Sequence, residues 1–180
     1  MPAMNAEVWV PAVPMRMGSM NNLAILLYDE GHHAEAEKSY REVLGIYETL
    51  DVELRVWGPE HPGTLDLMGN LAVAIGREGR FAEAEKLERE TLQSQRRILG
   101  PESWDAALSK YRLGCILLFK GNRDQALSLI RESVDHGLPS SEVLEYIERN
   151  PDLASLHGDP RFAAIEADAK ERAAAAQKPK

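Results

Sequence analysis

The feature that most constrains the fold is a stretch of sequence that the chain repeats. Asn22–Leu44 reads NLAILLYDEGHHAEAEKSYREVL, and 48 residues later Asn70–Leu92 reads NLAVAIGREGRFAEAEKLERETL, with 13 of the 23 positions identical. A fainter third copy, RLGCILLFKGNRDQALSLIRESV, follows 42 residues further on at Arg112–Val134. Self-similarity at such a period is typical of solenoids, in which stacked units bury their apolar faces against one another.

The apolar residues within each copy have helical spacing. In the first copy Met20, Leu23, Ala24 and Leu27 fall at i, i+3, i+4 and i+7, which predicts one amphipathic helix. A glycine then ends that helix, because a residue without a Cβ can take a positive φ; these glycines are Gly31, Gly79 and Gly121. A second helix begins two or three residues later. Small residues on both helices allow close approach; they are Ala24, Ala72, Gly114, Ala36, Ala84 and Ala126.

The pattern therefore divides the chain into three parts. Residues 15–138 are predicted to form a solenoid of three helix hairpins, at about 15–57, 62–99 and 104–137. Gly58-Pro59 and Gly100-Pro101 end the first two hairpins, and His61 and Ser103 are placed to cap the helices that follow. Residues 1–14 are predicted to be a flexible N-terminal arm, and residues 139–180 a helical C-terminal cap with a frayed tail. Within the cap we predict a short helix from Ser140 or Ser141 to about Arg149, capping at Asn150-Pro151 and Asp159-Pro160, and a last helix at about 160–176.

These positions resemble the tetratricopeptide repeat. The offsets of its pattern are filled in the first copy by Leu23-Ala24, Leu27, Gly31, Ala36 and Tyr40. Glu88 and Ile130 stand where the second and third copies would carry the aromatic residue. The copies exceed the usual period of about 34 residues, and the linkers at 58–62 and 100–103 resemble the kinesin-light-chain variety, with lengthened helices. The stretch 150–162 is similar to the tail of bacterial members. The resemblance implies an all-α fold, an α-solenoid of three antiparallel hairpins with C-terminal capping helices.

The family resemblance also implies a concave groove lined by the first helix of each hairpin. Asn22, Asn70 and Arg112 occupy the groove positions at which peptide-clamp members hold an extended peptide and its terminal carboxylate. An amide offers a donor and an acceptor to one peptide unit, and a guanidinium offers a planar fork to a carboxylate. The lysines of the clamp are replaced by Gly18 and Leu108, a departure that favours binding of the peptide backbone over its carboxylate. The alternative is that the two asparagines bond only to neighbouring helices.

Further positions at helical spacing extend this candidate groove. They are Asp29, Arg77 and Phe119, seven residues after the first set, with Tyr111 beside them. Ile25, Val73 and Cys115 come three residues after the first set, and ordinary interhelical core is the favoured interpretation for them. Cys115 lies in an apolar run without a cysteine partner, which is typical of a buried, inert thiol.

Charge and composition exclude several function classes. A net charge of −8 argues against nonspecific binding to nucleic acid or anionic membranes, which needs a basic patch. No apolar run reaches the roughly 20 residues of a membrane span, and the first residues do not resemble a signal peptide. One cysteine excludes an intramolecular disulfide. We therefore expect a cytoplasmic protein.

No catalytic or metal-binding constellation is visible. Adjacent His32 and His33, with Glu35 and Glu37 nearby, lie at a turn and lack the closed ligand set of a structural zinc site. Glutamates on the second helices, among them Glu88, alternate with lysine and arginine, which is typical of a solvated face. The sequence thus predicts no cofactor and no enzyme.

Two functions remain. The favoured hypothesis is a noncatalytic adaptor that binds a partner peptide or helix in its groove. The alternative is a structural solenoid piece that self-associates through the first helix, which has no preceding repeat to cover it, or that belongs to a larger assembly.

Overall fold

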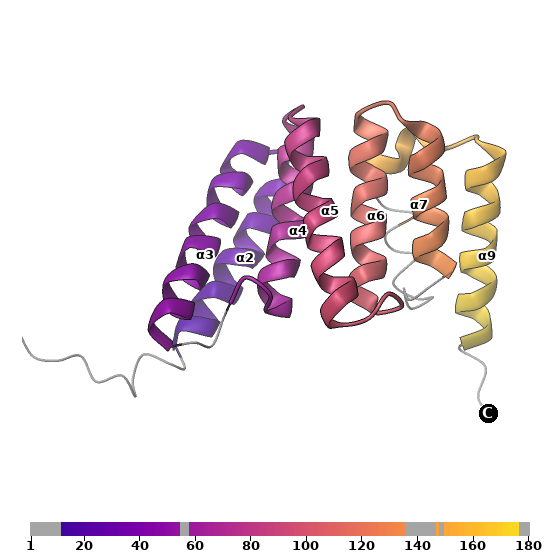
Figure 1. The fold of residues 1–180 in the computed structure, drawn as a ribbon. Coiled ribbons are helices and arrows are strands. Elements are labelled where there is room, and N and C mark those ends of the chain that lie inside the picture. Colours follow the sequence, from indigo (N-terminus) through magenta and orange to yellow (C-terminus); the bar gives the residue numbers. More distant parts are fainter. Residues whose placement is uncertain (1–11, 55–57, 136–146, 148–149, 177–180) are drawn as a thin grey trace, which may run out of the picture.

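A computed structural model describes residues 12–54, 58–135, 147 and 150–176. These residues form helices and no strand, in the arrangement of Figure 1. In chain order the elements are α2 (Ala12–Asp29), α3 (His33–Leu54), α4 (Pro62–Arg77), α5 (Phe81–Ile98), α6 (Trp104–Phe119), α7 (Arg123–Asp135), the 3₁₀ helix η1 (Pro151–Leu156) and α9 (Pro160–Ala176). The predicted all-α solenoid is confirmed.

The hairpins α2–α3, α4–α5 and α6–α7 stand side by side (Figure 1), and each packs against the next. The first helices form one layer, in which α4 contacts both α2 and α6 directly. Among the described residues, the backbones of α3 and α5, and those of α5 and α7, do not approach each other to the same extent. Because the first helices are the more tightly spaced layer, they form the inner, concave side of the stack, as the family resemblance implies.

Local signals set the predicted helix ends. The three turn glycines all have positive φ, between 83° and 87°, the backbone conformation that side chains other than hydrogen disfavour. His61 caps α4, since its Nδ1 accepts a hydrogen bond from the N–H of Gly63 at 3.1 Å. Ser103 caps α6 in the same way, its Oγ accepting from the N–H of Ala106 at 3.3 Å. Both predicted caps are confirmed.

Small residues allow the two helices of each hairpin to pack closely together. Gly114 shows how tightly, because a Cβ at that position would lie 2.9 Å from Cγ1 of Ile130 and 3.2 Å from the carbonyl oxygen of Ala126. The alanines predicted to allow close approach are fully buried; they are Ala24, Ala36, Ala72, Ala84 and Ala126. The interhelical seams are dry at these positions, as expected for a close-packed protein interior.

The structure differs from the sequence prediction at the start of the solenoid. α2 begins at Ala12, before the predicted start at 15, because Pro14 is tolerated in the first turn of a helix. The predicted helix from Ser140 or Ser141 to Arg149 lies outside the described residues except for Ile147, as do residues 1–11 of the arm and 177–180 of the tail.

The C-terminal cap covers the last hairpin. Asn150 caps the short helix η1, its Oδ1 accepting from the N–H of Asp152 at 2.9 Å. α9 then packs against α7, burying Phe162, Ile165 and Ala169 in one apolar cluster with residues of α6 and α7. The predicted last helix and its role in covering the third hairpin are confirmed.

Candidate functional site

The groove positions predicted from the sequence lie on the inner layer but in different environments. Asn22 on α2 is exposed, Asn70 on α4 is half-buried, and Arg112 on α6 is buried. The structure brings the last two together. Nη2 of Arg112 donates to Oδ1 of Asn70 at 2.5 Å and to Oδ1 of Asp66 at 2.7 Å.

Arg112 reaches these partners by lying against the backbone of α4. A Cβ on Gly69 would be 2.5 Å from Nη1 of Arg112 and 3.1 Å from its Cζ. The missing Cβ of Gly69 therefore leaves room for the guanidinium in the position that it occupies. The Arg112 side chain is only 10% exposed, so the fork predicted to hold a ligand carboxylate is directed at two residues of the same chain.

The C-terminal segment crosses the inner layer and binds all three first helices. From α2, the Tyr28 hydroxyl donates to Oδ2 of Asp152 at 3.1 Å. From α4, Arg77 forms an ion pair with Asp152 and its Nε donates to the Tyr28 hydroxyl at 3.2 Å. From α6, the Tyr111 hydroxyl accepts from Nδ2 of Asn150 at 2.7 Å.

These contacts are largely shielded from water. The Asp152 side chain is 2% exposed and that of Arg77 is 26% exposed, and Arg77 also lies over the ring of Phe119, with Cζ 4.8 Å from the ring centroid. Burial raises the pKa of Tyr28 and of Tyr111, so both hydroxyls stay protonated. Sequence reasoning did not assign Tyr28, Asn150 or Asp152 to the site, because no local pattern links partners separated by 39 positions, as Tyr111 and Asn150 are, or by 124, as Tyr28 and Asp152 are.

The remaining predicted positions differ in how far they are exposed to solvent. Asp29 is exposed at the end of α2, whereas Tyr111 is 3% exposed. Cys115 is buried, which confirms the predicted buried thiol, and burial raises its pKa to about 12, which disfavours the reactive thiolate. Val73 is half-buried, and Ile25 is 38% exposed. The core interpretation of Ile25 was therefore wrong, since no preceding hairpin covers this side of α2 among the described residues.

Comparison with known proteins agrees with this geometry. Tetratricopeptide-repeat profiles match residues 16–50 and 63–136, which together make up more than half of the chain. The chain is a tetratricopeptide-repeat protein. Repeats of this family generally form protein-interaction or scaffold modules and are typically noncatalytic. No curated protein matches the sequence.

Several solved structures have a similar fold. BtubC (BKLC) from P. vanneervenii superposes with a TM-score of 0.62 at 19% identity, over 93% of this chain and 67% of that one. A kinesin-light-chain-related protein from Podosopora anserina, with nearly identical TPR-like repeats, gives 0.57 at 18% identity over 92% and 99% of the two chains. Its Q17M variant gives 0.56 at 21% identity over 91% and 89%. These likenesses show a fold of the kinesin-light-chain kind.

One position of the repeat holds a buried ionisable residue. Glu88 stands where the first repeat has Tyr40 and the third has Ile130, and it is fully buried, so its prediction as part of a solvated face was wrong. Burial raises the pKa of its carboxyl to about 7, while Arg112 and Ser109 act to lower it. The neighbouring helix pairs Glu37–Arg41 and Glu85–Arg89 do form, at 2.7 and 2.8 Å, with exposed arginines but with Glu37 itself buried.

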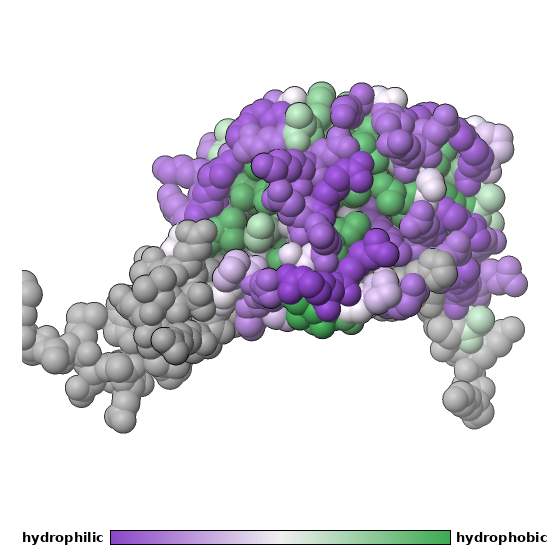
Figure 2. Space-filling model, in the orientation of Figure 1, coloured by the Kyte–Doolittle hydropathy of each residue, from purple (hydrophilic) through white to green (hydrophobic). Residues whose placement is uncertain are grey.

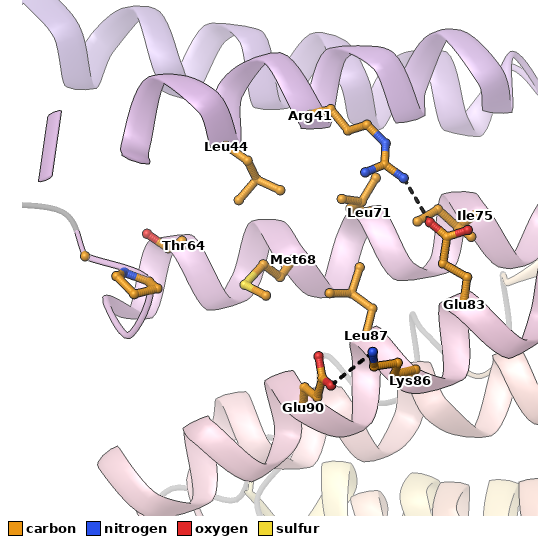
Figure 3. A pocket seen from close by; sticks show the side chains of 12 residues that line it. Arg41, Leu44, Thr64, Met68, Leu71, Ile75, Glu83, Lys86, Leu87 and Glu90 are labelled. Carbon is orange, nitrogen blue, oxygen red and sulfur yellow. Dashed lines mark hydrogen bonds and ion pairs between the residues drawn. The ribbon is translucent and has the colours of Figure 1, made fainter. Parts of the chain in front are cut away.

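The opposite, outer face of the tetratricopeptide stack has a cavity that the sequence did not indicate. Figure 2 shows this face as largely hydrophilic, with apolar patches between charged side chains. The cavity has a volume of about 360 Å³ and lies among α3, α4 and α5 (Figure 3). Its floor is apolar and its rim is charged; the floor includes Leu44, Met68, Leu71, Ile75 and Leu87, and the rim Arg41, Glu83, Lys86 and Glu90. Ion pairs Arg41–Glu83 at 3.0 Å and Lys86–Glu90 at 3.9 Å occupy the rim.

Neither a candidate metal site nor a candidate membrane span is found among the residues that the structure describes. No group of three or more His, Cys, Asp or Glu among the described residues could hold a metal ion. Within the same residues, no helix has both the length and the apolar character that crossing a membrane requires. His32 instead lies 3.5 Å from Glu35 at the surface.

Proposed function

We propose that the protein is a noncatalytic adaptor whose concave face binds a segment of a partner protein. The observation that carries the proposal is the set of contacts between the inner layer and residues 150–152. Side chains from α2, α4 and α6 hold this stretch by hydrogen bonds and an ion pair. The same face thus offers chemistry suited to polypeptide, and the chain's own segment occupies only the part near Tyr111 and Arg77.

The rest of the face is the proposed partner site. Asn22 is exposed there, and Asn70 keeps its amide N–H groups for a ligand while its Oδ1 accepts from Arg112. An asparagine amide can pair with a peptide N–H and C=O. Two such residues on adjacent helices would fix the register of an extended segment, as the resemblance to peptide-clamp repeats implies.

Peptide binding by matched variants tests this proposal. Peptides selected from a random displayed library would be titrated against the wild type and against Asn22→Ala/Asn70→Ala. We expect the double variant to lose about tenfold or more in affinity, a loss of roughly 1.4 kcal/mol. Arg112 is not substituted in this test, because its side chain is buried and paired with residues of the same chain. Gln93→Ala removes an exposed amide from α5 and serves as the control; equal affinity of the double variant and the control would contradict the groove assignment.

A second candidate function, self-association through α2, rests on a comparison of equivalent positions. Leu23 and Leu26 are 52% and 53% exposed. Their equivalents in the next repeat, Leu71 and Ala74, are at most 3% exposed because α3 covers α4. The exposed flank of α2 would be covered in the same way by another helix, either of a second copy or of a larger assembly.

Sedimentation velocity over a range of concentrations tests self-association. We expect the wild type to form dimers or larger species and Leu23→Glu/Leu26→Glu to remain monomeric. Leu99→Glu, at an exposed leucine far from α2, is the control. A monomeric wild type at the highest concentration would exclude this candidate. The cytoplasmic location expected from the sequence stays a prediction.

A further inference from the structure

Arg112 and Arg77, the two arginines predicted to line the groove, are already paired with carboxylates of the same chain. Arg112 is held by Asp66, and Arg77 by Asp152, whose side chain is 2% exposed. A ligand carboxylate that took Arg77 would leave the buried Asp152 charge without its partner, which is unfavourable in a poorly solvated environment. A free carboxylate is therefore a poor ligand for this face.

The C-terminal segment also closes the α6 end of the groove. Leu153 and Leu156 of η1 are fully buried, in one apolar cluster with Leu108 and Tyr111 of α6. Such burial holds the segment in place as part of the core. The surface that remains open to a partner lies over α2 and α4.

On this open surface the accessible polar groups are acceptors and amides. Asp29 is exposed, and it lies seven residues after Asn22, which places both on the same face of α2. Asp29 is also the last residue of α2, so the negative end of the helix dipole adds to its negative potential. The Asp66 side chain is 38% exposed. Ile25 and the half-buried Val73 supply an apolar strip between them.

Building on the proposed function, we infer that the partner segment is an internal, basic stretch of a protein that crosses α2 and α4. Its backbone pairs with Asn22 and Asn70, and a lysine or arginine side chain meets Asp29. Charge complementarity favours this occupant, because the cations of the face are neutralised and the whole chain carries a net charge of −8. An acidic segment or a free carboxyl terminus would find no available cation among the described side chains of this surface.

The test uses a random peptide library displayed between fixed linkers, so that no member has a free carboxyl terminus. Selected peptides would be synthesised as amides, as free acids, and with each lysine or arginine replaced by glutamine. We expect basic peptides to be selected, and a loss of about tenfold or more in affinity for the best lysine or arginine replacement and for Asp29→Lys. The amide and the free acid should bind equally within about twofold, and affinity should fall as salt rises. Glu132→Lys makes the same charge change at an exposed position on α7 and should leave affinity unchanged.

The outcomes separate this inference from the proposed function. Selection of acidic peptides, tighter binding of the free acid, or indifference to Asp29→Lys would overturn the inference. If the same peptides were still lost on Asn22→Ala/Asn70→Ala, the proposed groove function would stand. A library that gives no binder sensitive to the asparagine variant would contradict the proposed function, and the inference with it.

Discussion

The two seams between successive hairpins have the same architecture but bury different proportions of polar side chains. Where α3 meets α4, the buried residues include Tyr40, Val43, Leu67 and Leu71, all in one apolar cluster. The α5 and α6 helices instead bury a set of polar side chains; this set comprises Glu88, Thr91, Gln95, Ser109, Lys110 and Arg112. Sequence repetition therefore preserved the backbone arrangement while the side chains of the seam changed.

This difference indicates which features specify the fold. Turn glycines and small interhelical residues recur in every hairpin, whereas the residues of the seam do not. An apolar seam gains stability from area removed from water, but a polar seam depends on how well its groups are paired. We expect the first seam to contribute more to stability and the second to make stability depend on pH.

The largest effect is expected in the apolar seam. Tyr40 is 2% exposed, and Tyr40→Ala removes its ring from the cluster and should destabilise the protein by about 3–5 kcal/mol, as for other large-to-small core changes. Urea unfolding followed by circular dichroism measures the loss. Tyr40→Phe keeps the ring and should cost less than about 1.5 kcal/mol. If Tyr40→Ala cost no more than Tyr40→Phe, the first seam would not be the stronger one.

A smaller, pH-dependent effect is expected in the polar seam. Burial raises the pKa of Glu88 from 4.5 to about 7, so the folded protein holds a proton between these values that the unfolded chain has released. This contribution to stability is fully present below about pH 4.5 and is lost as pH rises through about 7. The loss is on the order of 3 kcal/mol, from about 1.4 kcal/mol per pKa unit.

Glu88→Gln removes this proton equilibrium while keeping the shape of the side chain. The difference in unfolding free energy between Glu88→Gln and the wild type should therefore increase in favour of the variant from about pH 5 to pH 8. Denaturant unfolding at a series of pH values measures it. Parallel stability curves for the two proteins would show that Glu88 has the same proton affinity in the folded and unfolded states.

The smallest effects are expected where ion pairs cross the seams at the surface. Glu83 pairs with Arg41 across the first seam at 3.0 Å, and Glu85 with Lys120 across the second at 2.9 Å. Because the basic partners are about half exposed, Glu83→Gln and Glu85→Gln should each change stability by less than about 1 kcal/mol. Thermal unfolding at low and high salt measures both. A larger loss at only one seam would mean that its surface charges, rather than its interior, hold the hairpins together.

The repeat made most of the fold predictable from sequence. Equivalent residues recurring after 48 and then 42 positions identified the hairpins, and local chemistry at His61, Ser103 and the turn glycines gave their ends. These features act within a few residues of one another, so a linear pattern contains them. The environment of Glu88 was missed because alternating charges on α5 resemble a solvated face, although its place at the aromatic position of the repeat was the available signal.

The candidate site was less predictable. The sequence placed Asn22, Asn70 and Arg112 on one side of the stack, but it did not show that Arg112 would be bound by Asp66 and Asn70. That pairing depends on Gly69, which leaves room for the guanidinium. The contact of Asp152 with Tyr28 and Arg77 depends on the return of the chain across the groove. Such long-range contacts arise from tertiary packing and leave no periodic trace in the sequence.

The lone cysteine gives the molecule an internal reporter. Cys115 lies in the buried cluster shared by α6, η1 and α9, and its high pKa keeps it as the unreactive thiol. A thiol reagent can reach it only after that cluster opens. The rate of labelling would then report, from a single native atom and without any engineered residue, how often the C-terminal part of the protein opens.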